Sequence, residues 1–464
     1  MREILKDVLE DINPELDEMK GLKRTCENLE RAGEKYKKEY GYEPLFCGSI
    51  AKDTWLKSKK DVDLFLMFDR DIDMEELEEK GLEAGRRIVE SLGGEWEIAY
   101  AEHPYVQGEV NGYEIDVVPA YDTDPDNIKS SVDRTPWHVK WVEKNLSDEQ
   151  RDEVRLLKKF TKEHGLYGSD LKTMGFSGYL CEILIEEYGD FEGVLKAAKD
   201  WHPGEVIDPE EQFKSKDYLK RKKFKGDVLI VIDPVDKDRN VASVLSDENF
   251  LLFRKRARKF VEDPSRERFF KEKHKPLSLL DLQERIDRRG TDFMLVKFDA
   301  PDVHDDVLYP QMRKLNGRLE DILDDEGFVV LRRGEWSNGE VCVLILELEV
   351  DELPRMDKRR GPPIFDKRNS KKFIERYEGE HNLLVEDGKW YAEYFREWTT
   401  ALDFAKDLLH DDAETLQEEG VPRHLAEKMS EGITIATGDH SIHIFEEEEG
   451  LREKMAEYFE KDLA

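Results

Sequence analysis

Two aspartates one residue apart, Asp61 and Asp63, have the spacing in this sequence that most directly predicts chemistry. Side chains alternate along a strand, so both carboxylates are expected on one face with Cα atoms about 7 Å apart, while Val62 and Leu64 point into the core. Carboxylates placed in this way can share divalent metal ions, and two metals about 4 Å apart suit phosphoryl or nucleotidyl transfer. A lone Asp-x-Asp in an acidic chain is more often a surface feature, so other residues must support the interpretation.

The pair Gly48-Ser49, which eleven residues separate from Asp61, gives that support. A glycine lets the backbone approach a ligand closely, and the amides that begin the next helix can bind a phosphate. The alternative role for Ser49 is simply to cap that helix. The spacing therefore predicts a phosphate-binding turn beside a carboxylate-bearing strand.

A third carboxylate, Asp116, lies in a second predicted strand. Asn111-Gly112 between two alternating runs is typical of a hairpin turn, with strands at 105–110 and 113–118. Asp116 is flanked by apolar residues inside the second strand, where a carboxylate is costly unless it is paired or binds a metal. We therefore predict Asp116 as the third ligand, with a solvent-exposed hairpin carboxylate as the alternative.

The elements expected around these residues form a sheet flanked by helices. Apolar residues at three- and four-residue spacing predict two helices over residues 1–40, separated at Pro14 with Asn13 as a cap. The sheet is expected to end at Val118-Pro119, and Thr135 is expected to cap the next helical region. The other expected elements are strands at 40–46, 61–68, 96–101, 105–110 and 113–118, and helices at 50–56, 74–92 and 131–145.

The rest of the chain is predicted to be mostly helical and then α+β. Near 264–276 the pattern changes to strand, helix, strand, strand, with a hairpin loop at 336–339. The length of 464 residues fits two to four domains, and we predict three, at 1–140, 141–265 and 266–464. The expected helices are at 152–164, 176–188, 191–201, 244–261 and 308–326. The expected strands are a buried one at 228–234 and others at 293–299, 328–333 and 340–349.

Composition limits the class of protein. No apolar run reaches 18 residues and no signal peptide is recognisable at the start, so we expect no membrane partner. Four scattered cysteines fit reduced thiols in a cytoplasmic protein. The net charge of −34 by itself argues against a polyanionic partner, and the 39% of charged residues would allow the ion-pair networks of a hot or salty interior.

Basic residues nevertheless gather in four short clusters, at 57–60, 214–225, 254–259 and 266–275. Two of the clusters contain aromatic residues, and such mixtures can pair with phosphates and stack on bases. The alternative is a set of solvated helix faces with extended lysines. Several such clusters in an acidic chain favour one nucleic-acid-binding face.

Taken together, Gly48-Ser49, Asp61-Val-Asp63 and Ile115-Asp116-Val117 resemble the polymerase-β-like nucleotidyltransferase superfamily. Further stretches narrow the resemblance to the archaeal, class I CCA-adding enzymes, which are tRNA nucleotidyltransferases. These stretches are YAEHPY at 100–105, DVVP at 116–119, SVDRTP at 131–136, EVRLLK at 153–158, GFSGYLC at 175–181, DPVD at 233–236, RNVA at 239–242, DDVLYP at 305–310 and RGP at 360–362. The similarity is dense over residues 2–245 and reappears beyond them.

The resemblance implies a multidomain α+β protein: a polymerase-β-like nucleotidyltransferase head, a mostly helical central domain for nucleotide and base recognition, and an α+β C-terminal RNA-binding body and tail. It implies a cytoplasmic, Mg²⁺-dependent enzyme that adds C, C and A to the 3′ end of tRNA from CTP and ATP without a template. It also implies contacts with the tRNA acceptor stem and T arm, and a homodimer.

Site residues are implied position by position. Asp61, Asp63 and Asp116 match the catalytic, metal-binding carboxylates, and Arg239 matches an arginine that helps present the edge read by the incoming base. The implied nucleotide-binding residues are Gly48, Ser49, Lys52, Thr135, His138, Lys158, Tyr167 and Arg239. Two positions depart from the family pattern: Asp61 stands where glutamate is frequent, and Lys52 stands where arginine is expected, which keeps the charge but loses the bidentate fork.

Besides Ser49, four of the nucleotide-binding residues also have a structural alternative. His138 could be a satisfied helix histidine, Lys158 a solvated partner of a neighbouring acid, and Tyr167 a core aromatic. Arg239 could pair with Asp236. For the whole chain, the rival functions are a poly(A) or uridylyl polymerase and a non-catalytic RNA-binding protein, the latter disfavoured by the complete carboxylate set.

Overall fold

The computed structural model describes residues 1–57, 61–100, 103–270, 275–379 and 381–461. Parts of the basic clusters at 57–60 and 266–275, and of the motif at 100–105, lie outside these ranges. Contacts divide the chain into two compact units, residues 1–272 and 273–462. No helix in the described ranges has both the length and the apolar character needed to cross a membrane.

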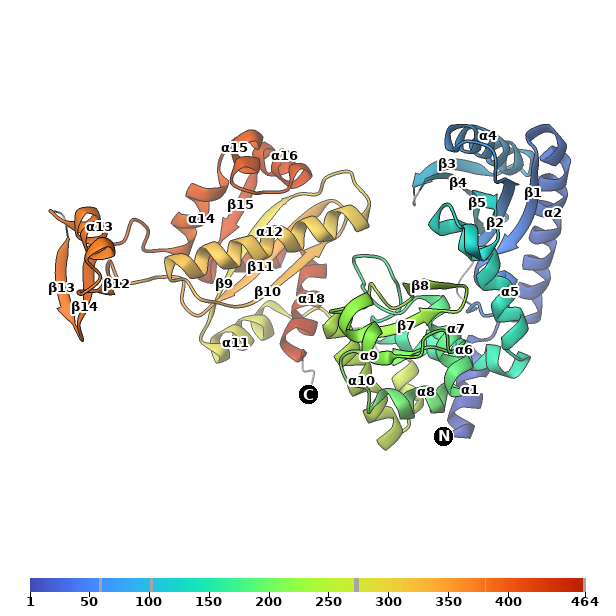
Figure 1. Ribbon diagram of the computed structural model, residues 1–464, viewed down its shortest axis with the longest axis horizontal. Coiled ribbons are helices and arrows are strands. Elements are labelled where there is room, and N and C mark those ends of the chain that lie inside the picture. The colour runs from blue at the N-terminus through green and yellow to red at the C-terminus, as the bar shows by residue number, and fades with distance from the viewer. Residues whose placement is uncertain (58–60, 101–102, 271–274, 380, 462–464) are drawn as a thin grey trace. The chain divides into compact units, whose positions relative to one another are not determined.

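A five-stranded sheet organises the start of the first unit, in the order β1-β2-β5-β4-β3 (Figure 1). β2 and β5 are parallel, and the other neighbours are antiparallel. The strands are β1 (Tyr42–Cys47), β2 (Asp61–Asp69), β3 (Glu95–Tyr100), β4 (Pro104–Val110) and β5 (Tyr113–Asp122). The hairpin predicted at Asn111-Gly112 is confirmed, because β4 and β5 pair as antiparallel neighbours on either side of that turn.

The predicted end of the sheet at Val118-Pro119 is wrong, because β5 continues to Asp122. Pairing between β4 and β5 stops at Val117, whereas pairing with β2 continues beyond it. Pro119 therefore lies where β5 has a neighbour on one side only, and a strand tolerates the missing N–H there.

Helices cover both faces of this sheet. α2 (Leu16–Tyr40) and α4 (Met74–Ser91) lie on one face (Figure 1) and pack against the even-numbered residues of β2, such as Leu64. On the other face, α5 (Thr135–Asn145) places Val139 against Phe65 and Met67. Because side chains alternate, the odd-numbered residues of β2 and the even-numbered residues of β5 share the face of α5.

Three local predictions need correction. Asn13 does not cap α2; it follows α1 (Arg2–Ile12), and Glu15 forms a capping box with Glu18 instead. Thr135 does not cap α5 through its side chain, because a 3₁₀ turn leads directly into the helix and gives Thr135 helical dihedrals. The short helix expected at 50–56 is α3 (Gly48–Ala51), a single turn.

The remainder of the first unit is mostly helical and shares a core with α1. Leu157, Phe160, Leu184 and Phe253 are wholly buried in this core. The small sheet β6-β7-β8 packs beside it, and every residue of β7 is buried. The elements are α6 (Asp148–Glu163), α7 (Gly178–Tyr188), α8 (Phe191–Ala198), β6 (Glu205–Ile207), α9 (Lys216–Tyr218), β7 (Leu229–Asp233), β8 (Asp236–Asn240) and α10 (Asp247–Glu262).

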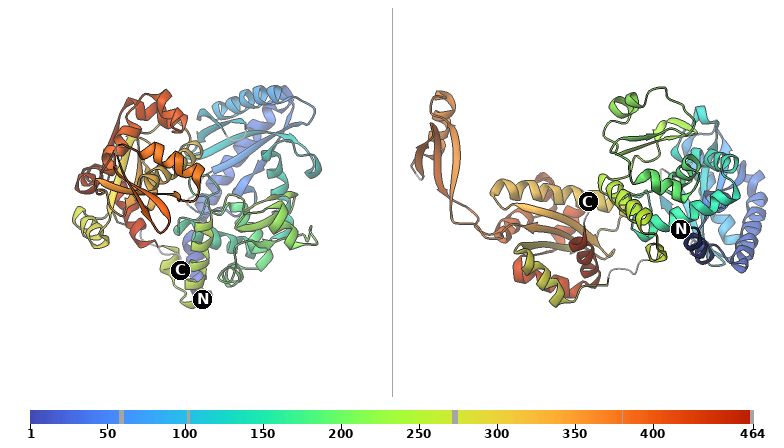
Figure 2. Two further views of the ribbon diagram at one scale, coloured as in Figure 1. Left: turned by 60° about the vertical axis from the view of Figure 1, so that its left-hand side comes forward. Right: turned by 90° about the horizontal axis from the view of Figure 1, so that it is seen from below.

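The second unit contains the predicted strand, helix, strand, strand order as β9, α12, β10 and β11. Its four-stranded antiparallel sheet, β10-β11-β9-β15, packs on α12 and on the helices α14 to α16 on one face, and on α11, α17 and α18 on the other. A second sheet, β12-β14-β13, carries α13 on one face (Figure 2).

The bounds in the second unit are α11 (Leu279–Arg289), β9 (Asp292–Asp299), α12 (Asp305–Glu326), β10 (Val330–Ser337), β11 (Val341–Leu348), β12 (Met356–Pro363), α13 (Lys367–Tyr377), β13 (Asn382–Glu386), β14 (Lys389–Phe395), α14 (Ala401–Leu409), α15 (Ala413–Glu418), α16 (Arg423–Glu431), β15 (Ile433–Ala436), α17 (Ile442–Glu447) and α18 (Glu449–Glu460). Most strands in both units are five to eight residues long, which is an ordinary length for globular proteins.

Candidate active site

The sheet of the first unit brings the predicted carboxylates together. Asp63 in β2 is the direct ladder partner of Asp116 in the parallel strand β5. Asp61 lies two residues earlier on the same face, and all three side chains belong to partly buried residues. The predicted alternation is confirmed on the core side, where Val62 and Leu64 are buried.

A glutamine that the sequence interpretation missed holds one of these carboxylates. The Gln107 amide donates from Nε2 to Oδ1 of Asp116 at 2.9 Å and to Oε1 of Glu114 at 2.8 Å. Burial raises the pKa of Asp116 to about 6; the hydrogen bond from Gln107 opposes this rise, and the charges of Asp63, Glu114 and Asp61 add to it. The site therefore concentrates negative charge that a cation would relieve.

The donor set fits Mg²⁺ bound together with a phosphate-bearing substrate. Within the described ranges, no three acidic, histidine or cysteine side chains already converge as a closed metal cage. Mg²⁺ rarely uses such a cage, because it usually keeps waters and binds through one or two carboxylates and substrate phosphates. Three carboxylates on one sheet face, one of them with a pKa raised by burial and by the charges of nearby acids, match that open arrangement.

Gly48 has no room for a side chain. Its φ of +69° lies in the left-handed region, and a Cβ added there would lie 1.7 Å from Oδ2 of Asp63. Glycine is therefore required for the backbone to pass the carboxylate. Ser49 lies inside the first turn of α3, where Cys47 occupies the cap position, so the alternative role of Ser49 as the cap is wrong.

Lys52 and Lys158 meet at a buried carboxylate, Glu182, which the sequence interpretation also missed. Lys52 Nζ lies 2.6 Å from Oε2 of Glu182, and Lys158 Nζ lies 3.0 Å from Oε1. Thr54 donates from Oγ1 to the same Oε1 at 2.7 Å. Glu182 is 0% exposed and Lys158 is 2% exposed, so the alternative of a solvated Lys158 pair is wrong.

The charges at Glu182 balance only in part. Burial would raise the pKa of Glu182, but the ammonium groups of Lys158 and Lys52 outweigh that effect and lower the pKa to about 2. One carboxylate thus faces two ammonium groups, which leaves a net positive charge for an anionic ligand.

Tyr167 lies beside this cluster. A Cβ added to Gly178, the first residue of α7, would lie 3.1 Å from the hydroxyl oxygen of Tyr167 and 3.3 Å from Cε of Lys158. The Tyr167 ring also packs against the core of the helical part, so its structural alternative holds for the ring, while its hydroxyl and the Lys158 side chain both lie beside Gly178.

His138 and Arg239 meet at a second buried carboxylate, Asp233. His138 Nε2 lies 3.1 Å from Oδ2 of Asp233, and Arg239 donates to the same oxygen at 2.8 Å. The expected alternative pair of Arg239 with Asp236 is wrong, since Asp236 pairs with Arg134 at 2.8 Å. Thr135 occupies the first residue of α5, one turn before His138.

Tyr179 joins the two clusters. Its ring stacks on His138 with a centroid distance of 3.8 Å, and Lys52 Nζ lies 5.3 Å from the same ring. Its hydroxyl lies 3.3 Å from Oδ1 of Asp233. Five of the predicted nucleotide-binding residues therefore lie around two buried carboxylates and one stacked tyrosine, namely Lys52, His138, Lys158, Tyr167 and Arg239, and Thr135 lies one helical turn from His138.

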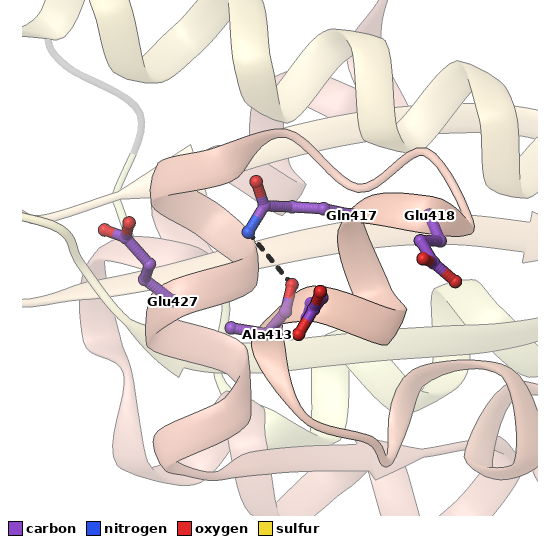
Figure 3. Close-up of a pocket in the computed structure, with 5 residues that line it drawn as sticks. Ala413, Gln417, Glu418 and Glu427 are labelled. Atoms are coloured by element: carbon purple, nitrogen blue, oxygen red, sulfur yellow. Dashed lines mark hydrogen bonds between the residues drawn. The ribbon is translucent and has the colours of Figure 1, made fainter.

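A separate hollow in the second unit has different chemistry (Figure 3). Its volume is about 550 Å³, and its lining residues are Ala413, Glu414, Gln417, Glu418 and Glu427. None of these was predicted as a site residue. Three carboxylates make the hollow unsuited to phosphates.

Comparison with known proteins identifies the family. The family model described as nucleotidyltransferase domain matches residues 26–138, that of the tRNA nucleotidyltransferase second domain matches residues 152–271, and that of the CCA-adding enzyme C-terminal domain matches residues 289–438. A CCA-adding enzyme from Methanocaldococcus jannaschii is 40% identical over 451 residues, which cover 96% of this chain and 97% of the relative. The chain belongs to the family of archaeal CCA-adding enzymes.

Another member of the CCA-adding enzyme family, from Archaeoglobus fulgidus, is 42% identical over 403 residues, 86% of this chain and 87% of its own. A solved structure of a cytoplasmic RNA terminal U-transferase covers 59% of this chain and 99% of its own at 13% identity, with a TM-score of 0.46, and carries no argument about function. The predicted family and the multidomain nucleotidyltransferase fold are confirmed.

Proposed function

We propose that this chain completes and repairs the 3′ end of tRNA by adding C, C and A from CTP and ATP without a nucleic-acid template. The observation that carries the proposal is the near full-length identity with CCA-adding enzymes, combined with carboxylates on β2 and β5 that are direct ladder partners. The tRNA 3′-hydroxyl oxygen attacks the α-phosphorus in line, the bond from that phosphorus to the β-phosphate oxygen breaks, and pyrophosphate leaves.

The three aspartates would hold Mg²⁺ and place the reacting groups. When bound, Mg²⁺ lowers the pKa of the 3′-hydroxyl and neutralises charge on the triphosphate. Asp116 is the candidate acceptor of the hydroxyl proton, because it lies on the strand beside Asp63. Gln107 donates a hydrogen bond to its Oδ1, which leaves Oδ2 as the oxygen that would take the proton. Positioning and charge neutralisation then supply most of the rate.

The clusters at Glu182 and Asp233 would hold the nucleotide. Lys52 and Lys158 carry the net positive charge that offsets the triphosphate, with the backbone at Gly48-Ser49 beside them. Tyr167, Thr135 and His138 would contact the nucleotide from the helices that border the site. Arg239 would help read the base, because cytosine and adenine differ from uracil and guanine in whether the ring nitrogen on the pairing edge accepts or donates a hydrogen bond.

Other parts of the proposal concern the whole protein. We propose that the regions 1–140, 141–265 and 266–464 act as catalytic head, nucleotide-recognition domain and tRNA-binding body with tail. The last would contact the acceptor stem and T arm through A-form backbone shape. A cytoplasmic location and a homodimer complete the proposal.

The direct test uses a tRNA that ends at its discriminator base. With CTP and ATP together, the pure protein is expected to add three nucleotides and stop; with CTP alone it is expected to stop after two. Gel analysis of the labelled tRNA after incubation with each nucleotide separately measures this. Long homopolymer tails would identify a poly(A) or uridylyl polymerase, and Mg²⁺-dependent nucleotide binding without incorporation would identify a non-catalytic protein.

Gly48→Ala is expected to lower nucleotide addition by roughly 100-fold, because the added Cβ displaces the carboxylate of Asp63 by about an ångström or more. Gly41→Ala is the matched control, since Gly41 has a similar φ of +79° but no atom within 4 Å of the added Cβ. In both variants the left-handed backbone at the new alanine lowers the free energy of unfolding by about 1–2 kcal/mol. Equal steady-state rates for the two variants would contradict the proposed role of this turn.

A further inference from the structure

Asp233 makes more polar contacts than an ordinary ion-pair partner. It is 0% exposed, and each of its oxygens accepts twice. Oδ1 lies 3.0 Å from the amide nitrogen of Val235 and 3.3 Å from the hydroxyl of Tyr179. Oδ2 lies 3.1 Å from Nε2 of His138 and 2.8 Å from a terminal nitrogen of Arg239. A carboxylate held by four donors from different segments cannot rotate without breaking several bonds.

The strand that carries Asp233 is equally constrained. Leu229, Ile230, Val231 and Ile232 of β7 are all 0% exposed, and Gln212 donates to the backbone oxygen of Asp233 at 3.0 Å. Asp233 therefore offers Arg239 a fixed point of attachment. The packing of β7 around Asp233 thereby holds the Arg239 side chain in place.

Arg239 is only partly enclosed. Its side chain remains 37% exposed, although one terminal nitrogen is bound to Asp233. A guanidinium is planar and carries five N–H donors in a rigid fork, so fixing one nitrogen fixes the plane in which the others are presented. Its charge is balanced by Asp233, which favours hydrogen bonding to a neutral base edge over binding a phosphate.

The neighbouring acids do not compete for Arg239. Asp236 pairs with Arg134, and Asp238 pairs with Lys223. His138 shares Oδ2 of Asp233, but burial lowers the pKa of His138, so the imidazole is neutral at pH 7 and donates from Nε2. Asp233 is thus the carboxylate that sets the orientation of Arg239.

We propose that Asp233 is a specificity-determining positioning residue that acts through Arg239, and that it makes the site select cytosine and adenine over uracil and guanine. The inference rests on the proposed function. N3 of cytosine and N1 of adenine accept a hydrogen bond, whereas N3 of uracil and N1 of guanine donate one. A guanidinium N–H held at a fixed position can donate a hydrogen bond to cytosine or adenine. With uracil or guanine it faces another donor, so both polar groups are left without a hydrogen bond.

The test compares selectivity in a double-mutant cycle. For tRNA substrates that await C or A, kcat/KM is measured with CTP against UTP and with ATP against GTP for the wild type, Asp233→Asn, Arg239→Gln and the double variant. Asp233→Asn keeps the shape of the side chain, but Arg239 then faces either an NH₂ group or an uncharged carbonyl oxygen, which is a weaker acceptor. The selectivity ratio is therefore expected to fall by about tenfold or more. In the Arg239→Gln background, Asp233→Asn is expected to change the ratio no further.

Two further variants separate positioning from stability. Asp236→Asn is the matched control on the adjacent ion pair, and its ratio is expected to equal that of the wild type. Asp233→Glu keeps the charge but moves the carboxylate by one methylene, so its ratio is expected to fall as well. A ratio is not changed by a fraction of unfolded enzyme, because that fraction lowers the rates with every nucleotide equally.

The outcomes separate this inference from the function on which it rests. Wild-type selectivity in either Asp233→Asn or Asp233→Glu would overturn the positioning role, as would losses in Asp233→Asn and Arg239→Gln that simply add. A wild-type protein that extends the tRNA with neither CTP nor ATP would instead overturn the proposed function.

Discussion

Asp63→Ala is expected to lower nucleotide addition by at least about 1,000-fold while leaving tRNA binding close to that of the wild type. Asp63 occupies the centre of the site: its strand neighbours are Cys47 on one side and Asp116 on the other, and Gly48 passes directly beside its carboxylate. Its removal takes away one of the three carboxylates that we propose bind Mg²⁺, but no apolar contact of the core. Single-turnover incorporation and a filter-binding or gel-shift measurement give the two quantities.

The same strands provide the control for that variant. Asp69 and Asp122 are ladder partners at the far end of β2 and β5, just as Asp63 and Asp116 are partners at the site, and both are exposed. Asp122→Ala is therefore expected to keep the wild-type rate. Incorporation at the wild-type rate by Asp63→Ala would show that the carboxylate face of this sheet is not the catalytic centre.

Glu182→Gln is expected to lower the free energy of unfolding by about 3–5 kcal/mol at pH 7, because it leaves two buried ammonium groups without a counter-charge. The control is Glu192→Gln on α8, which breaks a partly exposed i,i+4 pair with Lys196 and is expected to cost far less, because solvent screens that pair. Denaturant unfolding of the full chain measures both. Equal effects of the two variants would contradict the assignment of Glu182 as a charge-balancing core residue.

The Glu182 contribution is also expected to depend on pH. The Lys158 and Lys52 ammoniums override the effect of burial and lower the pKa of the folded carboxyl to about 2, below its ordinary value of 4.5. A lowered folded-state pKa means that the stabilisation is complete above pH 4.5 and is lost as the pH falls toward 2. The stability difference between wild type and Glu182→Gln should therefore shrink over that range, and a constant difference would count against the charge explanation.

Local pattern was sufficient to predict the carboxylate face. Alternation in β2 and β5 fixed which side chains share a face, and the cost of an unpaired carboxylate between apolar residues marked Asp116. Pattern could not predict that Asp63 and Asp116 are in register, because the pairing of β2 with β5 is a tertiary contact. The resemblance to a family supplied that expectation.

The buried acids were beyond reach of the sequence pattern. Glu182 lies within the apolar stretch 179–185 of α7, and its lysine partners are 24 and 130 residues away. Arg239 has Asp236 three residues before it, which made the nearer acid the natural partner, but Arg134 from another segment takes Asp236. Sequence distance favours local pairs, whereas buried charges are matched by whichever partners the fold supplies.

The parallel ladder between β2 and β5 also determines where this chain tolerates changes in length. Side chains repeat every two residues along a strand, so one residue added inside β5 before Asp116 would turn that carboxylate to the opposite face. The turn at Asn111-Gly112 lies outside the ladder, and a Cβ at Gly112 would meet no atom within 4 Å. That turn is therefore the place in the head sheet where a fluorescent label or a short peptide tag can be inserted without changing the register of the two carboxylate strands.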